Sequence, residues 1–154
     1  MTKLFSRRAL MIVGVSAAAT TACAQTARPS LELAVYKSPT CGCCGAWVQH
    51  MTEAGFQVRV TEVVDPGAAR RARGVPDALA SCHTAVTGGY VLEGHVPPED
   101  VRRLLAERPV ALGLAVPAMP LGSPGMETPD GRREAYETLL VMSNGGTRVF
   151  ARHG

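Results

Sequence analysis

The sequence has little net charge and no apolar run long enough to cross a membrane. Its 154 residues carry 16 basic and 13 acidic side chains, and three of the basic ones lie in residues 1–24, which contain no acidic residue. The rest of the chain therefore balances 13 basic against 13 acidic side chains, so charge gives no basis for binding nucleic acid or an anionic membrane. The apolar run at residues 10–22 is too short for a stable membrane anchor. The sequence also lacks repeats and heptads, which excludes repeat arrays and coiled coils.

Residues 1–24 have the pattern of an export signal. Three basic residues precede the apolar run, and the small residues 22–24 precede a cleavage that leaves Gln25 as the first mature residue. Residues 6–10, Ser-Arg-Arg-Ala-Leu, resemble a twin-arginine signal, and an ordinary Sec signal is the equal alternative. A lipoprotein acylated at Cys23 ranks lower, because the residues before it lack the usual aliphatic side chain. We therefore expect a periplasmic protein with no stable membrane insertion after cleavage.

The most informative pattern is three cysteines in four positions, Cys41, Cys43 and Cys44, with Cys82 as the one further cysteine of the mature chain. A disulfide inside so tight a cluster closes almost no loop and adds little stability. A bridge from Cys82 to the cluster would leave two thiols unpaired. The spacing therefore favours a metal-binding or thiol-exchange site over a structural staple.

The hydrophobic pattern predicts a thioredoxin-like α/β core with the order β-α-β-α-β-β-α. Strands are expected at residues 31–36, 56–64, 84–86 and 90–92, the last two joined by a Gly-Gly turn. Helices are expected from the cysteines to Gly55, over residues 66–73, and from residue 97 or 98 to 107. The first strand-helix-strand unit predicts a parallel pair with a right-handed crossover. The cysteines then lie at a helix N-terminus, where free N–H groups and the helix dipole stabilise thiolates.

The last third of the chain reads as an extension of this core. Residues 108–126 combine many prolines and glycines with apolar side chains, so we expect an irregular segment that lies across the domain near the cysteines. Residues 136–142 and 147–150 flank Ser-Asn-Gly-Gly and predict a β-hairpin. The predicted organisation is a signal at 1–24, a metal-binding core at 25–108 and a C-terminal extension at 109–154 packed on the core.

Three chemistries compete for the cysteines. Cys41 and Cys44 have the C-x-x-C spacing of thiol-disulfide enzymes, but Cys43 would compete for any mixed disulfide. Four thiolates suit zinc, but the adjacent Cys43 and Cys44 point in different directions, which disfavours one tetrahedral ion. Bridging thiolates suit several Cu(I) ions, and four of each sum to zero charge, which lowers the cost of burial. A disulfide-stabilised binding module without reactive thiols is a further alternative.

Several residues outside the triplet are candidates for the same site. Cys82 precedes the third strand, near where thioredoxin-fold enzymes place a proline that faces the active thiols, and is the predicted fourth ligand; its alternative is a small buried apolar residue. His83 is either a ligand of oxidised copper or outer-shell donor, or a hydrogen-bonded residue at a strand start. Met119 and Met126 are soft thioethers that shield the cluster or fill gaps.

The sequence predicts structural or solvent-exposed roles for the remaining histidines, the tryptophan and three arginines. His95 is expected to brace the turn before a helix, His50 to be exposed, and His153 to be a loose end. Trp47 is expected to pack beside the site. A solvated face is predicted for Arg70, Arg71 and Arg73.

Four segments resemble one bacterial family of small exported metal-binding proteins, long labelled a domain of unknown function, which includes the copper-resistance protein CopG. These segments are residues 36–47 (YKSPTCGCCGAW), Cys82-His83-Thr84, residues 94–97 (GHVP) and residues 113–126 (GLAVPAMPLGSPGM). The resemblance runs from residue 31 to the C-terminus. It implies a thioredoxin-like fold with a C-terminal extension and a cysteine-bridged multi-copper site.

The resemblance also implies a ligand set and a role. The ligands it assigns are Cys41, Cys43, Cys44 and Cys82, holding Cu(I) as several ions per chain. The implied role is copper resistance and homeostasis in the periplasm, with Cu(I)/Cu(II) interconversion as a copper oxidoreductase activity. The implied partners are copper ions and other periplasmic copper-handling proteins. A periplasmic thiol-disulfide oxidoreductase is the alternative function.

Overall fold

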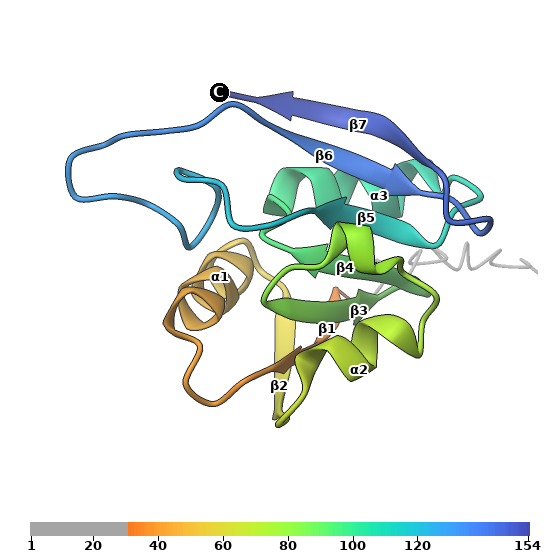
Figure 1. The fold of residues 1–154 in the computed structure, drawn as a ribbon, viewed down its shortest axis with the longest axis horizontal. Coiled ribbons are helices and arrows are strands. Elements are labelled where there is room, and N and C mark those ends of the chain that lie inside the picture. The colour runs from red at the N-terminus through yellow and green to blue at the C-terminus, as the bar shows by residue number, and fades with distance from the viewer. Residues whose placement is uncertain (1–30) are drawn as a thin grey trace, which may run out of the picture.

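A single seven-stranded sheet organises residues 31–154, the part of the chain that the computed structural model describes. The strands lie in the order β2-β1-β3-β4-β5-β6-β7 (Figure 1). The predicted signal at residues 1–24, with Cys23, lies outside the described residues.

The elements follow one another in the predicted order. The strands are β1 (Glu32–Lys37), β2 (Gln57–Glu62), β3 (His83–Thr87), β4 (Tyr90–Gly94), β5 (Gly113–Val116), β6 (Tyr136–Val141) and β7 (Thr147–His153). The helices are α1 (Gly42–Glu53), α2 (Pro66–Arg71) and α3 (Pro98–Glu107), with a 3-10 turn η1 (Asp77–Leu79). The predicted β-α-β-α-β-β-α core is confirmed, with β1 parallel to β2 and antiparallel to β3.

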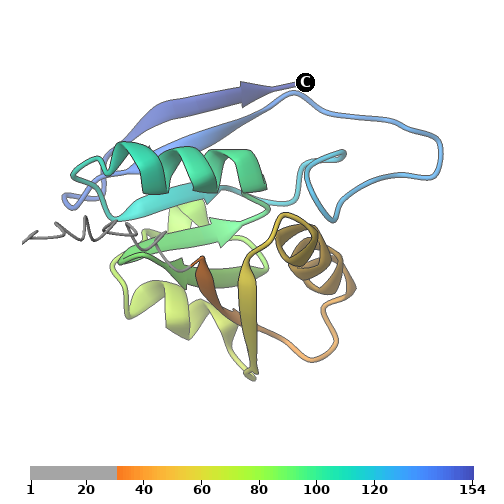
Figure 2. The same cartoon turned by 180° about the vertical axis from the view of Figure 1, so that it is seen from behind.

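The sheet is covered on both faces. The larger apolar cluster joins α1 and α3 to one face, and it includes Leu33, Val35, Trp47, Met51, Val101, Leu104 and Leu114. The smaller cluster lies on the other face, with Val75, Leu79, Val91, Ala115 and Val141. Figure 2 shows α3 in front of the sheet, and Figure 1, from the opposite side, shows α2 and η1 there. Residues three or four apart in α1, Cys44, Trp47 and Met51, are buried because they share the face toward the sheet.

The C-terminal extension departs from the prediction in one respect. Residues 113–116, predicted to be irregular, form β5, which pairs in parallel with β4 and antiparallel with β6. All four residues are buried, and the ladder satisfies their backbone groups. The predicted hairpin is confirmed as β6 and β7, and the loop between β5 and β6 runs outward above α1 in Figures 1 and 2. The extension thus continues the sheet of the core.

The chain end is better ordered than the sequence predicts. His153, expected to be loose, belongs to β7, and its Nε2 lies 2.9 Å from Asp100 Oδ2 and 3.1 Å from Thr138 Oγ1. Its ring also stacks on Tyr136. These contacts tie β7 to α3 and β6.

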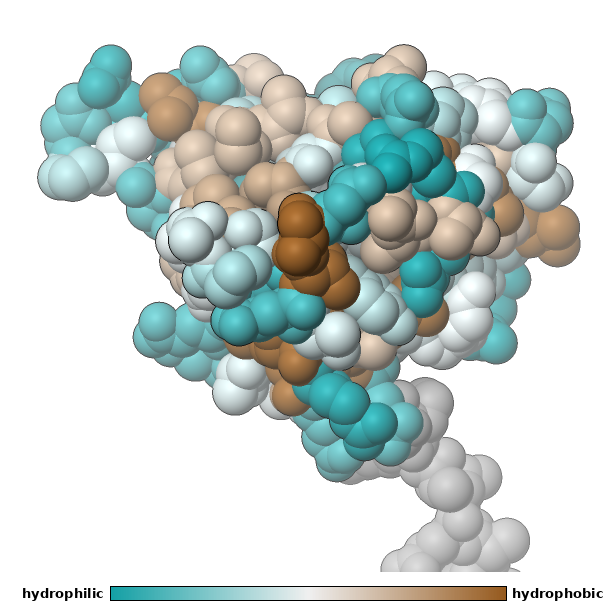
Figure 3. All heavy atoms as spheres, turned by 60° about the horizontal axis from the view of Figure 1, so that its bottom comes forward, coloured by the Kyte–Doolittle hydropathy of each residue, from teal (hydrophilic) through white to brown (hydrophobic). Residues whose placement is uncertain are grey.

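The exposed apolar side chains of the described residues are scattered. Figure 3 shows a narrow hydrophobic ridge with hydrophilic residues on either side. The large apolar residues that are exposed belong to separate parts of the chain: Val60, Val64, Val110, Met119 and Val149. Within residues 31–154, no helix combines the length and apolar character that crossing a membrane requires.

Candidate metal centre

The N-terminus of α1 gathers three cysteines because the helix begins directly after Cys41. Cys41 has extended backbone angles at the N-cap, and Cys44 is fully buried one turn later. Cys41 and Cys44 are joined by a disulfide, while Cys43 and Cys82 are free thiols. The bridged pair has the C-x-x-C spacing, and the free Cys43 Sγ lies 3.6 Å from Cys41 Sγ.

The sheet brings the fourth cysteine to this turn. Because β3 pairs with β1 and places His83 opposite Lys37, Cys82 lies beside the loop that leads into α1. Its Sγ is 3.8 Å from Cys43 Sγ, and its carbonyl oxygen is 3.6 Å from Cys44 Sγ. The sulfur atoms of the four predicted cysteines all lie within 4.8 Å of one another. The structure therefore assembles the predicted ligand set, and metal binding by it stays a prediction.

His95 also belongs to the site, a role that the sequence analysis missed. Its Nε2 lies 3.1 Å from Cys82 Sγ, and its Nδ1 lies 2.8 Å from the carbonyl oxygen of Pro124. A carbonyl only accepts, so Nδ1 carries the proton and Nε2 presents its lone pair toward the sulfur. This hydrogen bond to Pro124 fixes the orientation of the ring, as outer hydrogen bonds do for metal-binding histidines.

His83 completes a second donor group with Cys82 and His95, whose ligand atoms lie within 4.8 Å of one another. Its Nδ1 is 3.4 Å from Cys82 Sγ, and its ring packs 4.4 Å from the Trp47 ring. His83 is buried, and its Nε2 has no hydrogen-bond partner among the described residues. Trp47 packs beside the site as predicted, and its indole N–H donates to the Val96 carbonyl.

The 122–127 turn of the extension is seated on the cysteine end of α1, as the sequence predicts. A Cβ on Gly125 would lie 2.7 Å from both the Cys43 carbonyl oxygen and the Trp47 nitrogen, so the contact requires glycine. Both carboxylate oxygens of Glu127 accept from Gly125 N at 3.0 Å, and one lies 2.7 Å from His50 Nε2. His50, predicted to be merely exposed, thus helps to hold this turn.

The two predicted methionines are placed differently. Met119 is exposed and lines an open groove of about 440 Å³ between residues 116–120 and β6. Met126 is partly buried, and its carbonyl oxygen accepts from Gly122 N across the 122–127 turn. Their roles as shields or copper contacts stay predictions.

Comparison with known proteins agrees with this geometry. The family model described as a protein of unknown function, DUF411, matches residues 79–126, which contain Cys82, His83 and His95. A solved structure of the copper resistance protein CopG, Form 1, superposes with a TM-score of 0.75 at 40% identity, over 82% of this chain and 98% of that one. The chain belongs to the CopG family. Form 2 of that protein gives the same TM-score and identity over 80% of this chain and 98% of that one.

A search of the curated proteins finds no match. The CopG comparison confirms the resemblance and the fold that the sequence predicts. The cysteine and histidine side chains that could hold a metal ion therefore lie in a chain that is similar to a copper resistance protein.

Burial controls the protonation of this CopG-family site. Burial, followed by the neighbouring Cys43, raises the pKa of Cys82 to about 12. Burial, with smaller contributions from His95 and Lys37, lowers the pKa of His83 to about 3, and burial also lowers the pKa of His95. Both imidazoles are therefore neutral at pH 7 and carry lone pairs, whereas Cys82 stays a thiol until a metal displaces its proton.

The pKa of His83 predicts acid sensitivity of the metal-free protein. His83 binds a proton more readily in the unfolded chain, at a pKa of about 6.5, than in the folded chain, at about 3. The stability that comes from neutral, buried His83 is therefore fully present above about pH 6.5 and is lost progressively as the pH falls toward 3. Each pH unit costs about 1.4 kcal/mol at most, so roughly 3 kcal/mol is lost by pH 4. Urea unfolding at several pH values measures this slope. His83→Gln should flatten this slope, and equal slopes in His83→Gln and the wild-type protein would contradict the assignment.

Proposed function

We propose that this chain is a periplasmic copper-binding protein that holds Cu(I) in a cysteine-bridged multi-copper cluster and serves copper resistance. Cys41, Cys43, Cys44 and Cys82 supply the thiolates. The observation that carries the proposal is the approach of Cys82 Sγ to within 3.8 Å of Cys43 Sγ across 39 positions of sequence. Sulfurs so close to one another suit thiolates that bridge several soft ions.

The disulfide sets a condition on this function. Two electrons must reduce the Cys41–Cys44 bridge to two thiolates before four thiolates are available, and the bridged chain offers only Cys43 and Cys82. Copper capacity should therefore depend on the redox state of the chain. The two states provide an internal comparison within one sequence.

Anaerobic titration tests the proposal. Cu(I) is added to the fully reduced chain and to the disulfide-bridged chain, against a chromophoric Cu(I) chelator, and bound ions are counted per chain. The reduced chain should bind several Cu(I) ions, and the bridged chain at most half as many. Saturation of the reduced chain at one ion, or equal preference for Zn(II), would refute a cluster.

The histidines extend the proposal to Cu(I)/Cu(II) interconversion. Cys82, His83 and His95 form a mixed thiolate-imidazole group that shares one sulfur with the four-cysteine group. Imidazole tolerates Cu(II), whereas thiolates favour Cu(I), so adjacent groups of the two kinds suit an ion that changes oxidation state. Replacing His95 by Gln should shift the copper reduction potential upward, and an unchanged potential would count against this extension.

A second candidate function rests on the disulfide itself. The bridged C-x-x-C pair at a helix N-terminus has the arrangement of a thiol-disulfide oxidoreductase. Insulin reduction by the metal-free chain separates the two functions. Insulin reduction by the wild-type chain that is lost in Cys41→Ser would favour the enzyme. No insulin reduction by the wild-type chain would favour copper binding.

The periplasmic location is proposed from residues 1–24. Mass spectrometry of the protein purified from its native host should find Gln25 as the N-terminal residue. A lipid-modified Cys23 at the N-terminus would instead establish the lipoprotein alternative.

A further inference from the structure

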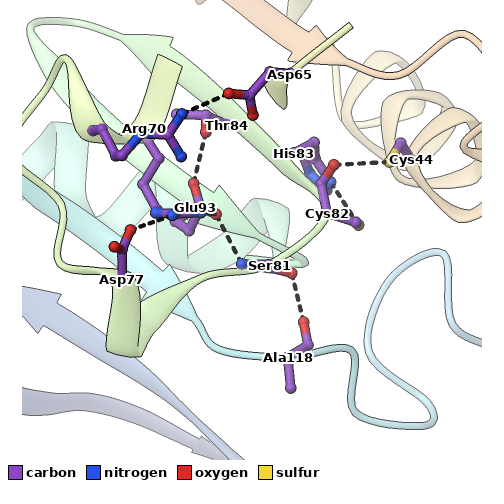
Figure 4. A network of polar contacts seen from close by, with 11 residues as sticks. Cys44, Asp65, Arg70, Asp77, Ser81, Cys82, His83, Thr84, Glu93 and Ala118 are labelled. Atoms are coloured by element: carbon purple, nitrogen blue, oxygen red, sulfur yellow. Dashed lines mark hydrogen bonds and ion pairs between the residues drawn. The ribbon is translucent and has the colours of Figure 1, made fainter. Parts of the chain in front are cut away.

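A buried ionic network lies directly behind Cys82. Arg70, predicted to be solvated, is 7% exposed, and its guanidinium bonds to Asp77 and lies 3.8 Å from Glu93 Oε1 (Figure 4). Glu93, on β4, is 1% exposed. Arg71, by contrast, is exposed, as the sequence predicts, and it pairs with Asp65.

The Glu93 carboxylate holds both residues that flank the Cys82-His83 pair. Oε1 accepts from the Ser81 backbone N–H at 2.8 Å, and Oε2 accepts from the Thr84 hydroxyl at 2.7 Å. Figure 4 shows these two bonds diverging from the carboxylate toward either side of Cys82. Two bonds from one rigid group fix the backbone of this short segment on both sides of the sulfur.

His95 directly follows the end of β4, two residues after Glu93. Between them Gly94 has a φ of +73°, and a Cβ there would lie 2.5 Å from Ser81 Oγ and from the Val116 carbonyl oxygen. The strand is thus pressed against Ser81. Glu93 therefore fixes the spacing between Cys82 Sγ and His95 Nε2, which are 3.1 Å apart.

The network reaches the C-terminal extension as well. Ser81 Oγ donates to the Ala118 carbonyl, and Ala118 N donates to the Ala80 carbonyl at 3.1 Å. Ala118 has a φ of +58°, an unfavourable angle for alanine that these two bonds hold in place. The segment that begins with Met119 is therefore anchored to the residue next to Cys82.

Stability alone is a weak reason for this network. Burial raises the pKa of Glu93, which shows that the site disfavours its charge. Buried ion pairs are often no more stabilising than apolar residues of similar volume. A buried carboxylate that bonds to both neighbours of a ligand pair is better explained by geometry than by stability.

We propose that Glu93 is the positioning residue of the metal centre, holding Cys82 and His95 at the separation that copper binding requires. The inference rests on the proposed function for its copper readout. A consequence is also expected in the metal-free chain. Without the hydrogen bonds from Ser81 and Thr84 to Glu93, the segment around Cys82 should open and the Cys82 thiol should react faster.

The first test compares Glu93→Leu with the matched control Glu107→Leu, whose carboxylate is exposed at the end of α3. Leucine accepts no hydrogen bond, so both the Ser81 N–H and the Thr84 hydroxyl lose their acceptor. Loss of an outer-shell partner typically weakens metal binding about 10- to 100-fold. Chelator competition should show this fall in Cu(I) affinity for Glu93→Leu only.

The second test uses the reduced, metal-free chains. Iodoacetamide labelling followed by peptide mass spectrometry gives the rate at Cys82 relative to Cys43, and this ratio should rise several-fold in Glu93→Leu. Where Glu93→Leu does not fold, Thr84→Val, which removes one donor to the carboxylate without changing shape, takes its place in both tests.

The two tests together decide the inference. If the wild-type chain binds copper, the inference requires both a lower Cu(I) affinity and a higher Cys82 labelling ratio in the variant. A lower affinity with an unchanged labelling ratio would show that Glu93 acts through its charge and would overturn a positioning role. An unchanged affinity would overturn that role too. If the wild-type chain binds no copper, the proposed function fails, and the labelling ratio alone decides whether Glu93 holds Cys82.

Discussion

Replacing Cys82 by serine should abolish the multi-copper site while leaving the fold intact. The variant removes the one sulfur that reaches the helix turn from a distant segment, 3.8 Å from Cys43 Sγ and 3.1 Å from His95 Nε2. It therefore removes the atom shared by the four-cysteine group and the thiolate-imidazole group. We expect Cu(I) stoichiometry to fall to one ion or none, and affinity by more than the ~100-fold that loss of an outer-shell partner costs.

Titration with Cu(I) under reducing, anaerobic conditions measures this loss. Unfolding of the metal-free variant is the control, and it should differ from wild type by about 1 kcal/mol or less, because serine nearly preserves the volume of a partly exposed cysteine. Full copper stoichiometry in a folded Cys82→Ser chain would rule out the shared-sulfur arrangement.

The second large effect is expected at Gly125, where the C-terminal extension meets α1. Alanine at this position is unfavourable for two reasons. The backbone φ is +87°, and the new Cβ would lie 2.7 Å from the Cys43 carbonyl oxygen and from the Trp47 nitrogen. The left-handed angle costs about 1 kcal/mol and the overlap with backbone about 1–3 kcal/mol more. The 122–127 turn should therefore lift from the cysteines, and His95 should lose its Pro124 acceptor.

Gly131→Ala is the matched control for this variant. Gly131 also has a positive φ, +73°, but its Cβ would meet nothing within 4 Å. Urea unfolding should show a loss of about 1 kcal/mol for Gly131→Ala and about 2–4 kcal/mol for Gly125→Ala. Copper transfer to a chelator should be faster only in Gly125→Ala. Equal behaviour of the two variants would mean that the turn does not cover the site.

Some features of the site could be predicted because they are local in sequence. The C-x-C-C pattern, a strand before it and apolar spacing after it place three sulfurs at a helix N-terminus whatever the rest of the chain does. The approach of Cys82 needed the further prediction that its strand returns beside the first one. The pairing of Lys37 with His83 confirms that approach.

His95 could have been found from the predicted hairpin. The Gly88-Gly89 turn pairs Thr87 with Tyr90, and the ladder continues to Thr84 opposite Glu93. Two residues further along the same register, Cys82 faces His95. The position of His95 just before a helix predicts only a role in the turn, whereas its strand partner reveals the contact with Cys82.

Arg70 and the β5 segment could not be predicted in this way. An arginine followed closely by two other arginines looks solvated, and only the tertiary structure brings Asp77 of η1 and Glu93 of β4 against it. Residues 113–116 look irregular among prolines and glycines, and they become a strand because β4 and β6 offer partners on both sides.

The sequence by itself determined the secondary structure order of the core, the position of the three clustered thiols and the thiol character of the candidate ligands, because these depend on side-chain chemistry and short-range spacing. Only the tertiary structure decided that Glu93 bonds to the residues beside Cys82, that Arg70 is buried and that Gly125 rests on α1. Those relations depend on strand register and on the close approach of backbones, which are fixed when the whole sheet forms.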